Sequence, residues 1–242
     1  MDNIGKVDYY TIGSGELTDV ANRTWLTITS LDLSTLTTTY LIMALLLIVA
    51  WIVSQNLKEI PGRMQIIAEW IVGGIDQLCK ESLGDALGRS FTPFITTLFV
   101  FLALCNYSGV FFFDEPTKDI NLPLSLALIG FFVALYQAFR FQGVFGYFWA
   151  LFWEPIPVIM FPLNVIGELS KVISISFRLF GNILGGSVII AVVSWLVKYF
   201  VLPIGLNAFF GVFVGTIQAF VFTMLTLAYI SQGIEIEEEA AV

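Results

Sequence analysis

The sequence predicts an all-α polytopic membrane protein with five transmembrane helices, the last two long and tilted, plus one amphipathic interfacial helix. Of its 242 residues, 57% are hydrophobic and only 12% are charged, whereas a soluble domain carries about 25% charged residues. The mean hydropathy is +0.87. The apolar tracts are long and uniform, which is typical of membrane helices and not of the short alternating strands of a membrane β-barrel.

A polar segment, residues 1–35, precedes the first apolar tract. It has room for one short helix and carries no motif. It lacks the basic-then-apolar order of a signal peptide, so we expect the membrane helices themselves to direct insertion. The first span is expected at about residues 36–53, at the start of a single membrane domain that extends to residue 232.

An amphipathic helix is expected at about residues 61–78. Pro61 suits the first turn of a helix, and apolar side chains then recur at intervals of three or four. The apolar set is Met64, Ile67, Ile71, Ile75 and Leu78, and the charged set is Arg63, Glu69 and Asp76. We interpret this pattern as a helix that lies at the membrane interface. A helix packed on a soluble partner would show the same pattern.

Four more spans are expected, at about residues 91–113, 122–139, 156–201 and 206–230. Pro116 ends any helix in the first loop between them, and Arg140 is expected to stop the third span. The tract at 156–201 is too long for one upright crossing. Because no proline divides residues 163–201, we favour one tilted helix over two short spans split near Lys171.

Basic loop residues indicate which ends of the helices face the cytoplasm. Five crossings put Lys58, Arg63, Lys80, Arg89 and Arg140 on one side and Lys6, Arg23, Lys118 and Lys198 on the other. The first group is the larger. We therefore expect a multi-pass protein of a bacterial inner membrane, with its N-terminus outside and its C-terminus in the cytoplasm.

The composition also narrows the function. The net charge is −8, and the acidic tail at residues 233–242 argues against binding of nucleic acid. The chain has no histidine and two cysteines, so it lacks the commonest metal ligand and general base. We expect no metal site, no cofactor and no catalytic residue. A glycine-rich loop ending in Gly-Lys-Ser or Gly-Lys-Thr is also missing, so we expect no bound nucleotide.

Two of the expected helices carry small or polar residues at helical spacing. In the fourth span, one face contains Lys171, Ser174, Arg178, Gly181, Asn182 and Gly185. In the fifth span the set is Gly211, Gly215 and Gln218. Glycines four residues apart let a neighbouring helix come close, and Asn182 and Gln218 suit a hydrogen bond between helices. These residues serve either a functional site or only the packing of the two helices.

Arg178 is costly in this tract, because a guanidinium in hydrocarbon costs from about 3 to well over 10 kcal/mol. Glu168, the acidic residue of the same tract, lies about 15 Å away along a helix and on another side. The counter-ion is therefore expected from another polypeptide or from water. A carboxylate that gains and loses a proton, on a proton or sodium path, fits best. A stand-alone secondary transporter that binds an anion at Arg178 is the alternative.

At these residues the sequence resembles subunit a of the F-type ATP synthases. The matching motifs are Phe177 to Asn182, Ile217 to Phe222 with Leu225 to Ile230, and Pro116 to Asn121 with Leu124 to Leu128. With the helix pattern, the resemblance extends from about residue 36 to residue 232. It implies a stator subunit that translocates H⁺ or Na⁺ and has no ATP site. The implied partners are the c-subunit ring, the b subunits of the peripheral stalk and the lipid bilayer.

The resemblance also implies roles for single residues. Two offset half-channels would connect a carboxylate of the rotating ring to the two sides of the membrane. Arg178 matches the arginine that attracts this carboxylate and blocks leakage, and Gln218 matches its neighbouring glutamine. Asn182, Ser125 and Asn106 match outer half-channel positions. From their position we expect Glu168, Lys171 and Ser174 in the inner half-channel, and the small residues Gly181, Gly185, Gly211 and Gly215 facing the ring.

Two positions depart from the family pattern. Many members carry Glu or His at the position of Ser187, and others pair it with His or Glu at the position of Gly211. Both positions are non-ionisable here. The outer half-channel then either runs through water, Ser187, Asn182 and Gln218, or uses a carboxylate elsewhere in the chain.

Overall fold

The structure, a computed structural model, describes residues 9–11, 30–55, 62–111, 115–152, 157–196 and 201–240. Within these residues, five helices are long and apolar enough to cross a membrane. This confirms the predicted helical membrane fold with five spans. Two short strands, β1 (Tyr9–Thr11) and β2 (Ser30–Asp32), pair antiparallel in the N-terminal segment, where the sequence predicted no strand.

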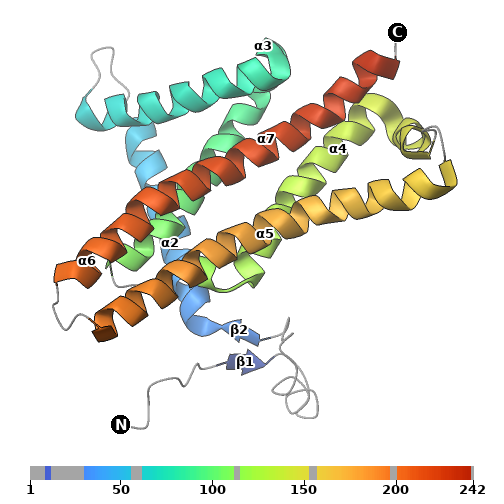
Figure 1. Ribbon diagram of the computed structural model, residues 1–242. Helices are drawn as coiled ribbons and strands as arrows, with labels where there is room; N and C mark the ends of the chain where they lie inside the picture. The colour runs from blue at the N-terminus through green and yellow to red at the C-terminus, as the bar shows by residue number, and fades with distance from the viewer. Residues whose placement is uncertain are drawn as a thin grey trace.

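Figure 1 shows the helices that follow. They are α2 (Leu33–Gln55), α3 (Arg63–Tyr107), α4 (Asn121–Phe152), α5 (Pro157–Leu196), α6 (Val201–Ala208) and α7 (Gly215–Ala240). Two 3-10 turns, η1 (Ser108–Phe111) and η2 (Pro116–Lys118), lie between α3 and α4. A π-helical segment, η3 (Phe209–Val214), joins α6 to α7 without a break.

Helix α3 contains both the expected amphipathic helix and the second span. The two arms meet at Gly84, which has φ 76° and ψ 168°, a conformation that is essentially restricted to glycine. The arms pack closely beyond this bend, because a Cβ atom on Gly88 would lie 2.8 Å from the backbone of Lys80. The location of the first arm at a membrane interface stays a prediction, and Pro61 lies outside the described residues.

The apolar part of α4 ends at Phe141, beside Arg140 where the third span was expected to stop, but the helix itself does not end there. Arginine is a good helix former, and α4 continues through it to Gly143, where φ is 72° and the helix bends before ending at Phe152. Helix α5 is one continuous helix of 40 residues, as favoured. It is about 60 Å long, twice the thickness of the hydrocarbon layer, so it must cross a membrane at a tilt. The acidic residues 233–240 continue helix α7.

Two apolar clusters hold the helices together. The first contains Leu98, Leu102 and Ala103 of α3, Ala127 of α4, Val172, Ile175 and Leu179 of α5, and Ala219 and Phe222 of α7. The second contains Ile75, Cys79, Leu83 and Ile95 of α3, Ala134 of α4, and Leu227 and Ile230 of α7. Helix α7 contributes to both clusters, so the predicted close packing around this helix positions the polar residues described below.

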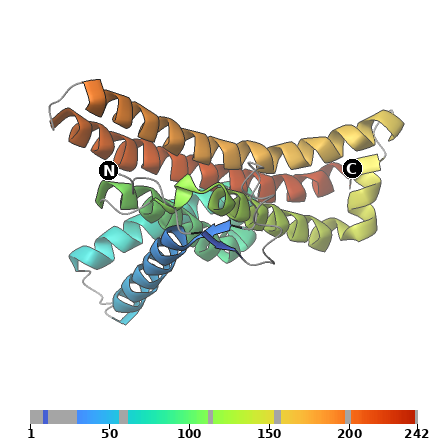
Figure 2. The same ribbon diagram turned by 90° about the horizontal axis from the view of Figure 1, so that it is seen from below.

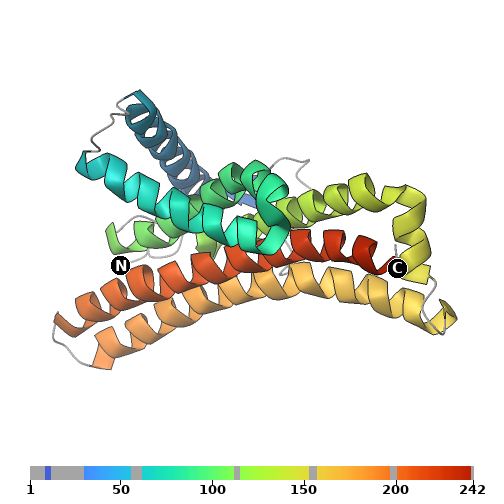
Figure 3. The same cartoon turned by 90° about the horizontal axis from the view of Figure 1, so that it is seen from above.

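Helices α5 and α7 run side by side in opposite directions along one edge of the molecule, while α2 lies toward the opposite edge (Figures 2 and 3). Both views show α5 bowed, with its outer side concave. Long helices usually bend the other way, convex toward solvent, because they wrap around their own core. The outer side of α5 includes the exposed apolar residues Ile173, Phe177, Leu184 and Val188. Its shape suits a convex, apolar partner.

Candidate functional site

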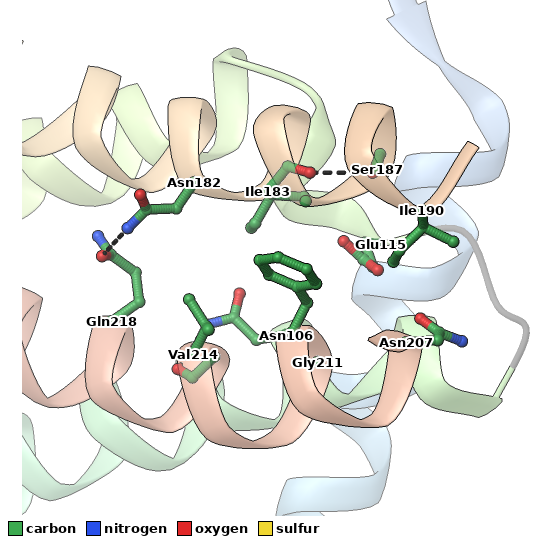
Figure 4. A pocket seen from close by; sticks show the side chains of 13 residues that line it. Asn106, Glu115, Asn182, Ile183, Ser187, Ile190, Asn207, Gly211, Val214 and Gln218 are labelled. Atoms are coloured by element: carbon green, nitrogen blue, oxygen red, sulfur yellow. Dashed lines mark hydrogen bonds between the residues drawn. The ribbon is translucent and has the colours of Figure 1, made fainter. Parts of the chain in front are cut away.

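A polar pocket lies between α5 and the continuous helix formed by α6, η3 and α7 (Figure 4). It contains about 410 Å³ of empty space, part of it open solvent. The polar residues that line it are Asn106, Glu115, Asn182, Ser187, Asn207 and Gln218, and the other lining residues are Ile183, Gly186, Ile190, Phe210, Gly211, Val214 and Gly215. A pocket with so many polar groups is suited to hold water, which needs two to four polar partners.

One end of the pocket is formed by a hydrogen bond between α5 and α7. The Nδ2 atom of Asn182 donates to Oε1 of Gln218 at 2.6 Å, and Figure 4 shows the pair facing each other across the two helices. Gln218 is only 5% exposed. The hydrogen bond that the sequence suggested between these two amides is therefore present.

Asn106 of α3 links three elements beside the pocket. Its Nδ2 atom donates to the backbone oxygen of Gly215 at 2.9 Å, and its Oδ1 accepts from Thr117 Oγ1 of η2 at 3.2 Å. The side chain is buried. Both polar ends of this amide are thus used within the chain, so Asn106 anchors the loop after α3 against α7 as well as lining the pocket.

Gly211 and Gly215 lie against the end of α3 and the turn η1 that follows it. A Cβ atom on Gly215 would lie 2.8 Å from Cβ of Asn106, and one on Gly211 would overlap the side chain of Val110. Both glycines are buried within this chain, and their expected place on a ring-facing surface does not agree with this packing. Gly181 and Gly185 of α5, in contrast, are exposed and have open space in front of the α-carbon.

Arg178 lies on an exposed position of α5. The described residues form three ion pairs, which join Lys80 to Asp76, Lys118 to Glu115, and Lys171 to Glu168. Within this part of the chain, Arg178 therefore has no carboxylate partner. Glu168, the acidic residue considered for this role, is occupied by Lys171 at 2.7 Å.

The polar residues expected in the inner half-channel lie on the other side of Arg178 from the pocket. Lys171 Nζ donates to Glu168 Oε1 and, at 3.2 Å, to Oε1 of Gln232 on α7. It also lies 5.2 Å from the centre of the Tyr229 ring. Ser174 is exposed nearby. Along α5, Arg178 thus separates a charged cluster at residues 168–174 from the pocket residues at 182–190.

Two serines have different positions. Ser187 is half-buried in the pocket and donates its hydroxyl to the backbone oxygen of Ile183 at 2.9 Å. Ser125 is exposed on α4, donates to the backbone oxygen of Leu122 at 2.9 Å and does not line the pocket. The structure therefore groups Ser187, Asn182, Gln218 and Asn106 in one site and leaves Ser125 outside it.

The sequence analysis missed two residues of the pocket, Glu115 and Asn207. The side chain of Glu115 is 13% exposed and lies 3.8 Å from Lys118 Nζ. Burial raises the pKa of the Glu115 carboxyl above its ordinary value, although Lys118 acts in the opposite direction. Asn207 donates to the backbone oxygen of Gly109 at 3.3 Å. The sequence signal that could have identified Glu115 is an acidic residue beside a proline, in a short loop between two spans.

The described residues contain no group of three or more His, Cys, Asp or Glu side chains that could hold a metal ion. They do contain a pocket of neutral amides and one carboxylate, next to an arginine without an acidic partner. These features define a class: a polytopic helical membrane protein with polar groups on both sides of a fixed positive charge.

Comparison with known proteins narrows this class to a family. The family model described as ATP synthase A chain matches residues 36–231, and the chain belongs to this family. A similar protein is ATP synthase subunit a, sodium ion specific, of Propionigenium modestum. The two are 37% identical over 216 residues, which covers 83% of this chain and 73% of that protein.

Proposed function

We propose that this chain is the ion-translocating stator subunit of an F-type ATP synthase and provides two half-channels to the carboxylates of a rotating c-subunit ring. The observation that carries the proposal is Arg178, which is exposed on α5 and has no carboxylate partner among the described residues. Membership of the ATP synthase A chain family supports it. The transported ion is H⁺ or Na⁺.

The pocket beside α5 serves as the outer half-channel. Its Asn182–Gln218 end lies one helical turn, about 6 Å, from Arg178 along α5. An ion that enters through water in the pocket thus comes close to the arginine. The ion pair of Glu168 and Lys171, with Ser174 nearby, serves the inner half-channel, about 6 to 15 Å from Arg178 in the other direction.

Arg178 acts as the barrier between the two half-channels. An ionised ring carboxylate is attracted by the guanidinium, which favours its charged form. A free cation is repelled and cannot pass directly from one half-channel to the other. The membrane voltage supplies about 2.3 kcal/mol per charge per 100 mV, and this work drives the ring only where no continuous pore dissipates it.

The concave outer side of α5 is the surface for the ring. The bow of the helix in Figures 2 and 3 and the exposed apolar residues Phe177 and Leu184 support this. Exposed Gly181 and Gly185 allow a ring helix to approach closely. We expect the b subunits to contact surfaces other than the outer side of α5. We place the protein in a bacterial inner membrane, with the N-terminus outside and the C-terminus in the cytoplasm.

The Arg178→Ala variant tests the proposed function. We expect it to abolish ATP-driven ion uptake into inverted membrane vesicles, because the ring carboxylate loses its cationic partner, while the complex still assembles. Ser187→Ala is the matched control and should lose much less activity, because the Ser187 hydroxyl is bonded to its own helix. Full coupled uptake by Arg178→Ala would refute the assignment.

The same assay decides between the two ions and addresses the alternative function. Uptake that persists in sodium-depleted buffer identifies H⁺, and uptake that requires added sodium identifies Na⁺. A stand-alone transporter that binds an anion at Arg178 would instead show anion flux without ATP synthase partners. Family membership favours the synthase subunit over this alternative.

A further inference from the structure

We propose that Glu115 is the ion-exchanging group of the pocket: its carboxylate takes up a proton or Na⁺ from the water outside and releases it toward the Asn182–Gln218 end. The inference rests on the proposed function, since it assigns a residue to the outer half-channel. It supplies the ionisable side chain that Ser187 and Gly211 do not provide.

The position of Glu115 in the pocket is the first support. The two ends of the pocket differ: the Asn182–Gln218 pair forms one end, and Glu115 and Asn207 lie toward the other (Figure 4). Of the 13 lining residues, Glu115 is the one with an ionisable side chain. Among the described residues, a cation that passes through this pocket therefore meets one carboxylate, at the end away from Arg178.

The second support is that the carboxylate of Glu115 occupies the space where a side chain at position 109 would lie. A Cβ atom on Gly109 would overlap the carboxyl group of Glu115. The backbone oxygen of Gly109 also accepts a hydrogen bond from Asn207 Nδ2 at 3.3 Å. Glu115 thus lies directly on the backbone of a glycine that α6 holds in place, and a larger residue at position 109 would displace the carboxylate from the pocket.

The third support is that Glu115 is ionisable without being locked in a tight ion pair. Its nearest cation among the described residues is Lys118 at 3.8 Å, whose side chain is 45% exposed and therefore largely hydrated. This pair is longer than a charge-assisted hydrogen bond of about 2.7 to 2.9 Å. Burial raises the pKa of the carboxyl, which brings proton exchange closer to neutral pH. The long distance to Lys118 leaves the carboxylate free to bind a proton or Na⁺, and the raised pKa favours the proton.

The exchange needs no other reactant. For a proton, one Glu115 oxygen accepts H⁺ from hydronium outside, leaving water, and then gives it to a pocket water that passes it toward the ring carboxylate. For sodium, the carboxylate and neighbouring amide oxygens replace part of the ion's water shell and release it again. In either case Glu115 returns to its ionised form, and Arg178 prevents direct passage to the inner side.

The experiment compares variants of the full ATP synthase complex in inverted vesicles, with and without sodium. Glu115→Gln keeps the shape of the side chain but removes its ionisation, and we expect ATP-driven uptake to fall at least tenfold. Glu115→Asp should retain more activity than Glu115→Gln. The matched control is Glu81→Gln, which changes an exposed glutamate bonded to Gln77 on α3 and should leave uptake unchanged.

A second pair of variants separates a relay from a structural role. Adding Ser187→Glu to Glu115→Gln places a carboxylate back in the same pocket and should restore part of the lost uptake. Gly109→Val should reduce uptake without changing the charge. Normal uptake by Glu115→Gln, at normal chain content and with Arg178→Ala inactive, overturns the Glu115 assignment alone. If Arg178→Ala is also active, the proposed function fails as well.

Discussion

At the scale of single residues, the site contains amide side chains whose hydrogen bonds are made within the chain. It also contains one arginine, Arg178, without an acidic partner among the described residues. Asn182 bonds to Gln218, and both ends of Asn106 are used. These amides keep fixed positions in the pocket. Arg178 has no carboxylate partner among the described residues, so its charge remains available to a passing group.

We predict that Asn182→Leu lowers the stability of the complex. Gln218 is nearly buried and would lose the donor at its Oε1 atom, which costs about 1 to 3 kcal/mol. The thermal midpoint of the purified complex, followed by tryptophan fluorescence, should fall by several degrees. Ser125→Ala serves as the control, because Ser125 is exposed and bonded to its own helix. Equal midpoints for the two variants would contradict the prediction.

Residue patterns within a helix were easier to predict than residues in loops. Arg178, Asn182 and Gln218 stand out because each is polar in an apolar tract whose helical period defines its neighbours. Glu115 lies in the short connection between α3 and α4, where the sequence has no period, and Asn207 lies in α6, just before the π-helical segment. Their approach to the pocket depends on the path of the loop over Gly109, which is a tertiary feature.

At the scale of helices, the number and order of the spans followed from hydropathy, but the ends of the helices did not. Hydropathy indicates which residues are transferred from water into the membrane. It does not indicate where the backbone stops being helical. Helix α4 passes Arg140 and bends at Gly143, and α3 bends at Gly84. At Gly84 the positive φ accompanies the close packing of the two arms of α3, which the local sequence does not determine.

The bend at Gly84 gives a prediction with an internal control. Gly84→Ala meets open space but forces alanine into a conformation that costs about 1 to 3 kcal/mol. Gly73→Ala on the same arm also meets open space, yet it should stabilise the helix by about 0.5 to 1 kcal/mol. The thermal midpoints of the two variants should therefore move in opposite directions. A rise of both midpoints would show that the backbone conformation at position 84 does not disfavour alanine.

At the scale of the whole molecule, the two polar regions lie on opposite sides of Arg178 along α5, while the packing of α7 against α3 and α4 supports both. Helix α2 adds a fifth span with little burial, since Ile42 is its one buried residue among those described. Its apolar side chains are suited to lipid. The molecule therefore combines a packed interior with one concave face open to a partner.

Cysteine labelling tests whether the two polar regions open to opposite sides of the membrane. A membrane-impermeant thiol reagent should modify Ser187→Cys from the outer side and Ser174→Cys from the cytoplasmic side. The native Cys79 and Cys105 are fully buried, so the unsubstituted chain should give little background. Labelling of both positions from the same side would contradict the two half-channels.

The π-helical segment at residues 209–214 has a consequence for the gene. A π-turn holds one more residue than the α-turn it replaces, so loss of a single codon here would restore a regular α-helix. Everything on its N-terminal side would then rotate by about 100° and carry Asn207 away from Gly109. Deletion of one residue in this segment would thus disrupt the pocket even if every residue that lines the pocket is kept. A relative with a one-residue gap here must form its own pocket from residues at other positions of the helix.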